Sequence, residues 1–199
     1  MLRKDKCNLY PVAFLNYGAA AGESVYHPHY QILTLPIIPP AVAHSLNGSR
    51  KYFNEHRACV HCVMLRFDRK EKKRVIDENR GALSIAPYVS RTPFEVRVFP
   101  KKHLPRFEET SEADLRAVVG VLQSALRRIK KQLHDPDLNF FIHTAPFNGA
   151  HGYYHWHIEI TPKISTGGGF ELGTGIDINV VDPEVAAAVL KGKSTVRKA

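Results

Sequence analysis

The stretch His155-Trp156-His157-Ile158-Glu159 places polar side chains at every second position, and His27-Pro28-His29-Tyr30-Gln31 repeats the pattern near the start of the chain. Alternate side chains of a β-strand lie on one face, so each stretch predicts a strand that presents two imidazoles and a hydrogen-bonding neighbour together. A neutral imidazole held in this way can attack a phosphorus atom. The alternative is a half-solvated polar sheet edge. Finding two such stretches in one chain favours a chemical site.

The segments around these stretches predict an α+β fold with an antiparallel sheet, because the strands are short and their connections are short. Extended segments are expected at residues 8–17, 31–38, 60–67, 73–77, 82–87, 94–99, 138–143 and 153–160. Helices are expected at residues 41–57, 111–133 and 183–190. The helix at 111–133 has apolar residues at helical spacing and Thr110 or Ser111 as its cap.

Composition limits the class of protein. The 199 residues, 44% of them hydrophobic, suit one domain or one domain with a fragment of another. The sequence has no apolar run long enough for a transmembrane helix and no apolar segment after the first residues typical of a signal peptide. With three cysteines and no disulfide framework, a reducing cytoplasm is the expected location. The net charge of +9 alone is weak support for nucleic-acid binding.

Cys59 and Cys62 have the two-residue spacing of a metal-binding knuckle. Two thiolates do not complete a tetrahedral site, so histidines must supply the other ligands. His103 and His155 are candidates. The alternative is a pair of buried or free thiols, but the abundance of histidine in this chain favours a metal.

The motifs together resemble the galactose-1-phosphate uridylyltransferase family of the histidine-triad superfamily, over about residues 12–190. The residues that carry the resemblance are Asn16, Gly18, Gly22, Ser24, His27-Pro28-His29, Gln31, Leu35-Pro36, Pro39, the cysteine pair, Pro93-Phe94-Glu95, Pro100-Lys101, His103, His143, Ala145-Pro146-Phe147-Asn148, the His155–Glu159 stretch, Gly169-Phe170-Glu171 and Gly173-Thr174-Gly175. The resemblance implies a histidine-triad-like antiparallel sheet with flanking helices.

The resemblance also implies roles for single residues. His29 would be the nucleophile, and Gln31 would steady the phosphoryl oxygens. The residues expected to contact the substrate are Asn16, Gly22 and Ser24 at the diphosphate and Phe170 and Thr174 in the loop that meets the hexose.

The expected metal is a structural zinc on Cys59, Cys62, His103 and His155. Some relatives hold a metal, either iron or a second zinc, with the residues matching His143, His155 and His157 and a glutamate near position 45. This chain has Ser45 at that position.

The family enzyme has two histidine-triad domains in tandem. Residues 1–44 therefore resemble the end of the first domain, residues 45–191 the whole second domain, and residues 192–199 a basic tail. The expected partners are a nucleoside diphosphate sugar, a sugar 1-phosphate, a second copy in a homodimer, and a separate chain that supplies the missing strands of the first domain. No membrane partner is expected, and nucleic acid is disfavoured.

The function implied is nucleotidyl transfer between sugar 1-phosphates through a covalent nucleotidyl-histidine. Three alternatives stay open. The first is a dinucleoside polyphosphate or ADP-sugar phosphorylase, the second is a histidine-triad hydrolase that uses His157, and the third is a truncated, non-catalytic nucleotide-binding domain.

Overall fold

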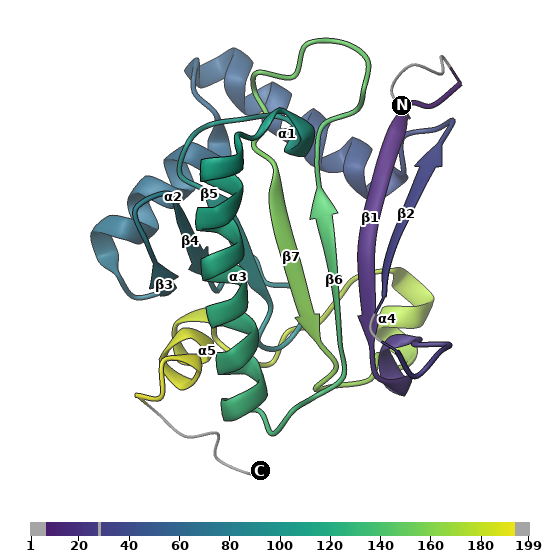
Figure 1. The fold of residues 1–199 in the computed structure, drawn as a ribbon, viewed down its shortest axis with the longest axis vertical. Coiled ribbons are helices and arrows are strands. Elements are labelled where there is room, and N and C mark those ends of the chain that lie inside the picture. The colour runs from purple at the N-terminus through teal and green to yellow at the C-terminus, as the bar shows by residue number, and fades with distance from the viewer. Residues whose placement is uncertain (1–6, 28, 194–199) are drawn as a thin grey trace.

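The computed structural model describes residues 7–27 and 29–193. Within these ranges seven strands form one antiparallel sheet in the order β2-β1-β6-β7-β5-β4-β3 (Figure 1). Their bounds are β1 Tyr10–Tyr17, β2 Tyr30–Leu35, β3 Val75–Glu78, β4 Ala82–Ile85, β5 Val96–Pro100, β6 Leu138–His143 and β7 His157–Pro162. This confirms the predicted α+β class and antiparallel sheet.

Helices cover both faces of this sheet. The helices are α1 Pro40–His56, α2 Val60–Glu71, α3 Glu112–Gln132, α4 Gly169–Thr174 and α5 Pro183–Leu190. Figure 1 shows α3 in front of the sheet and α1 and α2 behind it. Ile158 and Ile160 of β7 belong to the core on the α3 side. The alternate residues His157, Glu159 and Thr161 therefore face the α1 and α2 side.

The helix predicted at 111–133 is α3, and its features follow the sequence. The Ser111 hydroxyl accepts a hydrogen bond from the Asp114 amide at 3.2 Å, which satisfies one of the free donors at the helix start. The side chains that α3 buries against the sheet recur at helical spacing: Val118, Val121, Ala125 and Ile129. The predicted helix at 183–190 is α5, with Pro183 in its first turn and Asp182 as its cap.

The strand predicted at 60–67 is wrong, because residues 60–71 form α2. The buried positions are His61, Leu65 and Asp68, which lie four and three residues apart on one face of a helix. Leu65 packs with Leu83, Ile85 and Phe99 of the sheet. Burial of this stripe outweighs the β-propensity of the valines in the segment.

Strand β2 lies at one edge of the sheet and pairs with β1. On the α3 side of this pair Tyr30 is 72% and Ile32 is 65% exposed. In Figure 1 α3 lies in front of β4 and β5 and leaves β1 and β2 uncovered in front. An uncovered apolar sheet face beside an open edge is the kind of surface that further protein covers.

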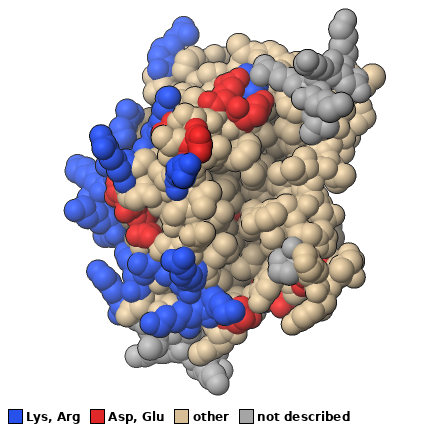
Figure 2. Space-filling view, in the orientation of Figure 1, with Lys and Arg blue, Asp and Glu red and all other residues tan. Residues whose placement is uncertain are grey.

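The basic residues gather away from that edge. Figure 2 shows lysine and arginine along the side formed by α2 and β3 and at the lower ends of α3 and α5, whereas the surface near β1 and β2 is mostly uncharged. Among the described residues, the longest and most apolar helices fall short of what a membrane crossing requires.

Candidate metal centre and histidine sites

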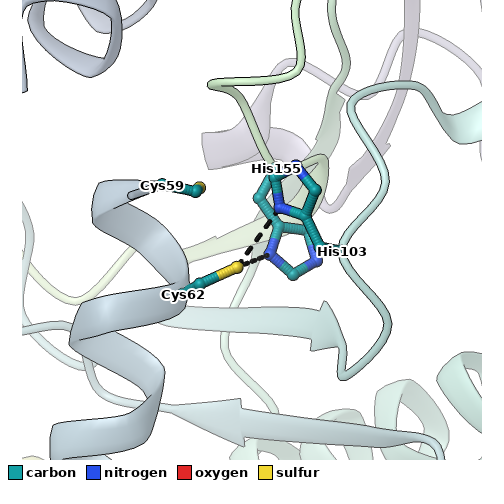
Figure 3. A group of neighbouring side chains, drawn as sticks. All are labelled: Cys59, Cys62, His103 and His155. Carbon is teal, nitrogen blue, oxygen red and sulfur yellow. Dashed lines mark hydrogen bonds between the residues drawn. The ribbon is translucent and has the colours of Figure 1, made fainter. Parts of the chain in front are cut away.

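One helix and two loops bring Cys59, Cys62, His103 and His155 together. Cys59 is the N-cap residue of α2, and Cys62 lies one turn further on. His103 follows β5, and His155 precedes β7. One ligand atom from each of the four side chains lies within 4.8 Å of all the others. Figure 3 shows the two imidazoles meeting the sulfur of Cys62, with Cys59 at the beginning of the helix.

Hydrogen bonds orient the imidazoles for metal binding. His103 Nε2 donates to the Gly152 carbonyl at 2.9 Å, which leaves Nδ1 facing the Cys62 sulfur at 3.2 Å. The Nδ1 atom of His155 lies 3.5 Å from the same sulfur. A backbone carbonyl that fixes the second nitrogen of a ligand histidine is a common feature of metal sites. Two thiols and two imidazoles form a tetrahedral donor set that fits zinc.

Two of the four side chains, Cys59 and His155, are held in the protonation state that binds metal. The hydrogen bond to Cys59 and burial raise the pKa of Cys62, so the cysteine pair shares one proton. The pKa of Cys59 is lowered to about 4, first by a hydrogen bond from the Cys62 thiol and then, against the effect of burial, by His103. Burial lowers the pKa of His155 to about 4, so its ring is neutral at pH 7. A thiolate and a neutral imidazole are the forms that coordinate zinc.

A second group of potential ligands lies on the same face of the sheet. His143 of β6, His157 and Glu159 of β7 bring their ligand atoms within 4.8 Å of one another. The alternative metal set was expected to contain His143, His155 and His157. In the structure His155 belongs to the cysteine group, and Glu159 is the third member of the group with His143 and His157. Ser45, at the position where some relatives have glutamate, contacts the Tyr154 hydroxyl at 3.5 Å.

The expected nucleophile His29 lies immediately before β2, and its Nδ1 donates to the His27 carbonyl at 2.8 Å. This leaves Nε2 unprotonated in the neutral ring. Gln31 is opposite Phe14 in the β1–β2 register, so both side chains lie on one face of the sheet. Gln31 lies on the sheet face that also carries His143 on β6, because Gln31, Phe14 and Phe141 are paired across β2, β1 and β6. His29 precedes the strand and has no partner in this register.

The loop before this strand is held by carboxylates. The Gly18 amide donates to Glu23 at 2.7 Å and the Ala20 amide to Asp137 at 2.6 Å. Gly18 has a φ of +87°, and a Cβ there would lie 2.0 Å from the Asp137 carboxylate, so only glycine fits. The carboxylates occupy two of the amides that a glycine-rich loop would offer to phosphate.

The remaining predicted contacts of the substrate lie around this loop and on α4. Asn16 donates to the Gly22 carbonyl at 3.2 Å and accepts from Asn139 at 2.8 Å. Ser24 is exposed. Segment 169–175, expected as a loop, contains the short helix α4, in which the Thr174 hydroxyl donates to the Phe170 carbonyl at 2.7 Å.

Two hollows lie between α1 and the sheet. One, of about 490 Å³, is lined by residues that include Phe14, Asn16, Asn139 and His143. The other, of about 400 Å³, is lined by residues that include His143, His157 and Glu159. His143 lines both hollows, so they are neighbours on this face of the sheet, whereas His29 and Gln31 are not among the residues that line either of them.

Sequence reasoning missed Arg91 and Arg97. The guanidinium of Arg91 lies 3.1 Å from one oxygen of Glu159, and Arg97 lies 3.3 Å from the other. Arg97 has one signal in the sequence, since it follows Glu95 by two positions in a predicted strand and so shares its face. Arg91 lies in a loop, and nothing in its spacing indicated this contact.

Sequence comparison now identifies the relatives of this chain. A family profile described as "Galactose-1-phosphate uridyl transferase, C-terminal domain" matches residues 45–178, more than half of the chain. The chain belongs to the galactose-1-phosphate uridylyltransferase family.

Individual relatives carry two names. An ADP-glucose phosphorylase of Arabidopsis thaliana is 40% identical over 92% of this chain and 51% of its own length. A galactose-1-phosphate uridylyltransferase of Thermotoga maritima is 31% identical over 92% of this chain and 59% of its own length. The chain thus spans between half and three-fifths of these relatives.

Solved structures of both kinds share the fold. The crystal structure of an ADP-glucose phosphorylase from Arabidopsis thaliana with bound ADP-glucose has a TM-score of 0.86 and 38% identity, and the match covers 96% of this chain and 62% of that one. A uridylyltransferase mutant has a TM-score of 0.89 and 30% identity, with 96% and 65% covered.

Proposed function

We propose that this chain takes part in nucleotidyl transfer between sugar phosphates, with His29 as the nucleophile. The observation that carries the proposal is the bond from His29 Nδ1 to the His27 carbonyl, which leaves Nε2 with a free electron pair. Membership of the family supports the same chemistry. The substrates proposed are a nucleoside diphosphate sugar and a sugar 1-phosphate.

The reaction has two displacements. His29 Nε2 attacks the α-phosphorus, the bond from that phosphorus to the bridging oxygen breaks, and a sugar 1-phosphate leaves. A nucleotidyl-histidine remains, so that one difficult step is divided into two easier ones. An acceptor phosphate oxygen then attacks the same phosphorus and releases the imidazole. Gln31 would donate to the phosphoryl oxygens, and Asn16, Gly22 and Ser24 would contact the diphosphate.

The acceptor separates the two functions found among the relatives. Attack by a second sugar 1-phosphate regenerates a nucleoside diphosphate sugar, which is the uridylyltransferase reaction. Attack by inorganic phosphate gives a nucleoside diphosphate, which is the phosphorylase reaction. The 40% identity to an ADP-glucose phosphorylase favours this second candidate as an alternative. The reactions share the first displacement and therefore the same role for His29.

The proposed zinc would be held by Cys59, Cys62, His103 and His155. Closed by four protein ligands, it would cross-link α2 to the loop after β5 and to the loop before β7, and it would supply no chemistry at the phosphate. This chain's own bonds then fix the loop that leads into β7, through the contact of His103 with the Gly152 carbonyl.

The division of the chain is also a proposal. Residues 1–44 would complete a first histidine-triad domain, residues 45–191 would form the second, and residues 192–199, of which 194–199 lie outside the described range, would be the basic tail. The open edge of β2 and the exposed Ile32 and Leu33 support pairing with strands from the rest of that first domain, in the same or a separate chain. A homodimer through the apolar segment after β7 is supported by exposed Phe170, Leu172, Ile176, Ile178 and Val180.

Isotope exchange tests the proposal. The zinc-loaded protein is incubated with UDP-glucose or ADP-glucose and labelled glucose 1-phosphate, without any other acceptor. We expect label to enter the nucleotide sugar, because the first displacement is reversible. His29→Ala should abolish the exchange, and His44→Ala, which changes an exposed histidine of α1, should retain it. Exchange that persists in His29→Ala, or no exchange by the folded zinc-loaded protein, contradicts the proposal.

A further inference from the structure

The second triad closely copies the first at the backbone and differs from it in charge. His157 Nδ1 donates to the His155 carbonyl at 3.1 Å, just as His29 Nδ1 donates to the His27 carbonyl. Two residues after the histidine, however, the first stretch has the neutral Gln31 and the second has Glu159. A carboxylate at that place repels a phosphate and attracts a cation.

Cations of the protein itself already occupy both oxygens of Glu159. Arg91 contacts one oxygen at 3.1 Å and Arg97 the other at 3.3 Å. His143 Nε2 lies 3.2 Å from the second oxygen. Both oxygens of Glu159 are therefore already engaged by groups of the protein itself.

The buried carboxylate of Glu95 is a fourth charged group, beside Glu159, Arg91 and Arg97. Arg97 also lies 2.7 Å from Glu95, which is fully buried, and the Arg91 amide donates to Glu95 at 2.7 Å. Two buried carboxylates thus face two guanidinium groups, and the charges of these four groups sum to zero. Asp177, which Arg91 also approaches, is half-exposed and therefore screened by solvent. A divalent ion on His143, His157 and Glu159 would leave two positive charges uncompensated in a buried place, which is costly.

The same arginine reaches the segment after α4. Arg91 Nε lies 3.9 Å from Asp177, and the Asn179 side chain donates to the Ser90 carbonyl at 3.4 Å. The ion pairs therefore connect the middle of the sheet to residues that follow the expected hexose loop.

We infer that Arg97 and Arg91 take the place of a second metal ion, so that the second triad is an internal ion-pair anchor for segment 176–180 and holds neither a metal nor a phosphate. His157 has the backbone arrangement of a nucleophile, but its partner carboxylate serves the arginines. The inference concerns a site separate from His29 and is independent of the proposed function.

Cobalt titration of the intact protein tests this inference. Thiolate-to-cobalt charge transfer reports the cysteine site, and elemental analysis reports the total metal per chain. We expect the protein to take up one ion per chain. Arg97→Lys, which keeps the charge, should also take up one. Arg97→Met should take up two, because the loss of one positive charge leaves the group at −1, and His143→Ala in that background should return the count to one.

Two results would overturn the inference. The first is uptake of two ions by the unaltered protein with loss of one in His143→Ala. The second is uptake of a single ion by Arg97→Met that retains the thiolate absorption and the circular dichroism of the folded protein. If Arg97→Met does not fold, Arg91→Met removes one charge from the same group at a half-exposed position. Uptake of two ions by this variant supports the inference, and uptake of one by the folded variant overturns it.

Discussion

Backbone carbonyls select the reactive nitrogen of several histidines in this protein. The carbonyls of His27 and His155 fix the rings two residues later, and the Gly152 carbonyl fixes His103 in the opposite sense, with Nδ1 free. The choice follows from local chain geometry, because each carbonyl lies within hydrogen-bonding distance of a ring nitrogen. Composition shows eleven histidines, but only the local backbone decides what each can do.

His151 gives a prediction for pH dependence. Its Nδ1 accepts from the Tyr153 hydroxyl at 2.8 Å and its Nε2 donates to the Asn148 carbonyl at 2.6 Å, so the buried ring is held neutral. Burial lowers its pKa below the ordinary value of 6.5. The unfolded chain therefore binds this proton more readily, and the stability that the neutral ring contributes is present above pH 6.5 and is lost as the pH falls toward the lower folded pKa.

Urea unfolding between pH 8 and pH 5 measures this effect. The free energy of unfolding should fall with pH below about 6.5. In His151→Gln this fall should be shallower, because unfolding then takes up fewer protons, by less than one per chain. His134→Gln, at an exposed site, should retain the original slope. Equal slopes for His151→Gln and the unaltered protein would contradict the assignment.

At the scale of elements, the contact between α3 and the β3–β4 turn depends on a missing side chain. A Cβ on Gly81 would lie 2.7 Å from the Cβ of Ala117 on α3. Gly81→Ala should therefore force the helix from the sheet and lower the free energy of unfolding by about 1–3 kcal/mol. Urea unfolding measures this change.

Gly120 provides the matched control on the same helix. A Cβ there would meet the Asn79 side chain at 3.6 Å, an ordinary contact. Gly120→Ala should leave stability unchanged or raise it by roughly 0.5–1 kcal/mol, because alanine favours a helix. Equal effects of the two substitutions would show that the close approach at Gly81 does not limit stability.

The elements also show what the sequence could predict. The N-caps of α3 and α5 followed from residue types. The set Cys59, Cys62, His103 and His155 followed from spacing and family resemblance, and the structure brings these four side chains together. The prediction of a strand at 60–67 was wrong because the segment is short and contains valines, which favour strands. The helical spacing of the buried His61, Leu65 and Asp68 is hard to recognise in so short a segment. The ion pair of Arg91 with Glu159 could not be predicted, since it joins a loop to β7 across 68 positions of sequence. The contact of Arg97 joins two different strands, β5 and β7, and their pairing is not encoded in local spacing.

At the scale of the whole molecule, one sheet carries two histidine stretches in different surroundings. The first lies at an open edge beside exposed apolar residues, and the second is enclosed by α1, α2 and the arginines. A site that must admit a sugar nucleotide needs the open position. The enclosed one suits a structural role, next to the four potential zinc ligands.

Locating a covalent nucleotidyl group tests this account most directly. The zinc-loaded protein is quenched after incubation with UDP-glucose or ADP-glucose, digested, and mapped by mass spectrometry. We expect one added nucleoside monophosphate per chain on the peptide that contains His29, and none on the peptide that contains His157. A label on His157, or no label on His29 in protein that holds its zinc and its fold, would contradict it.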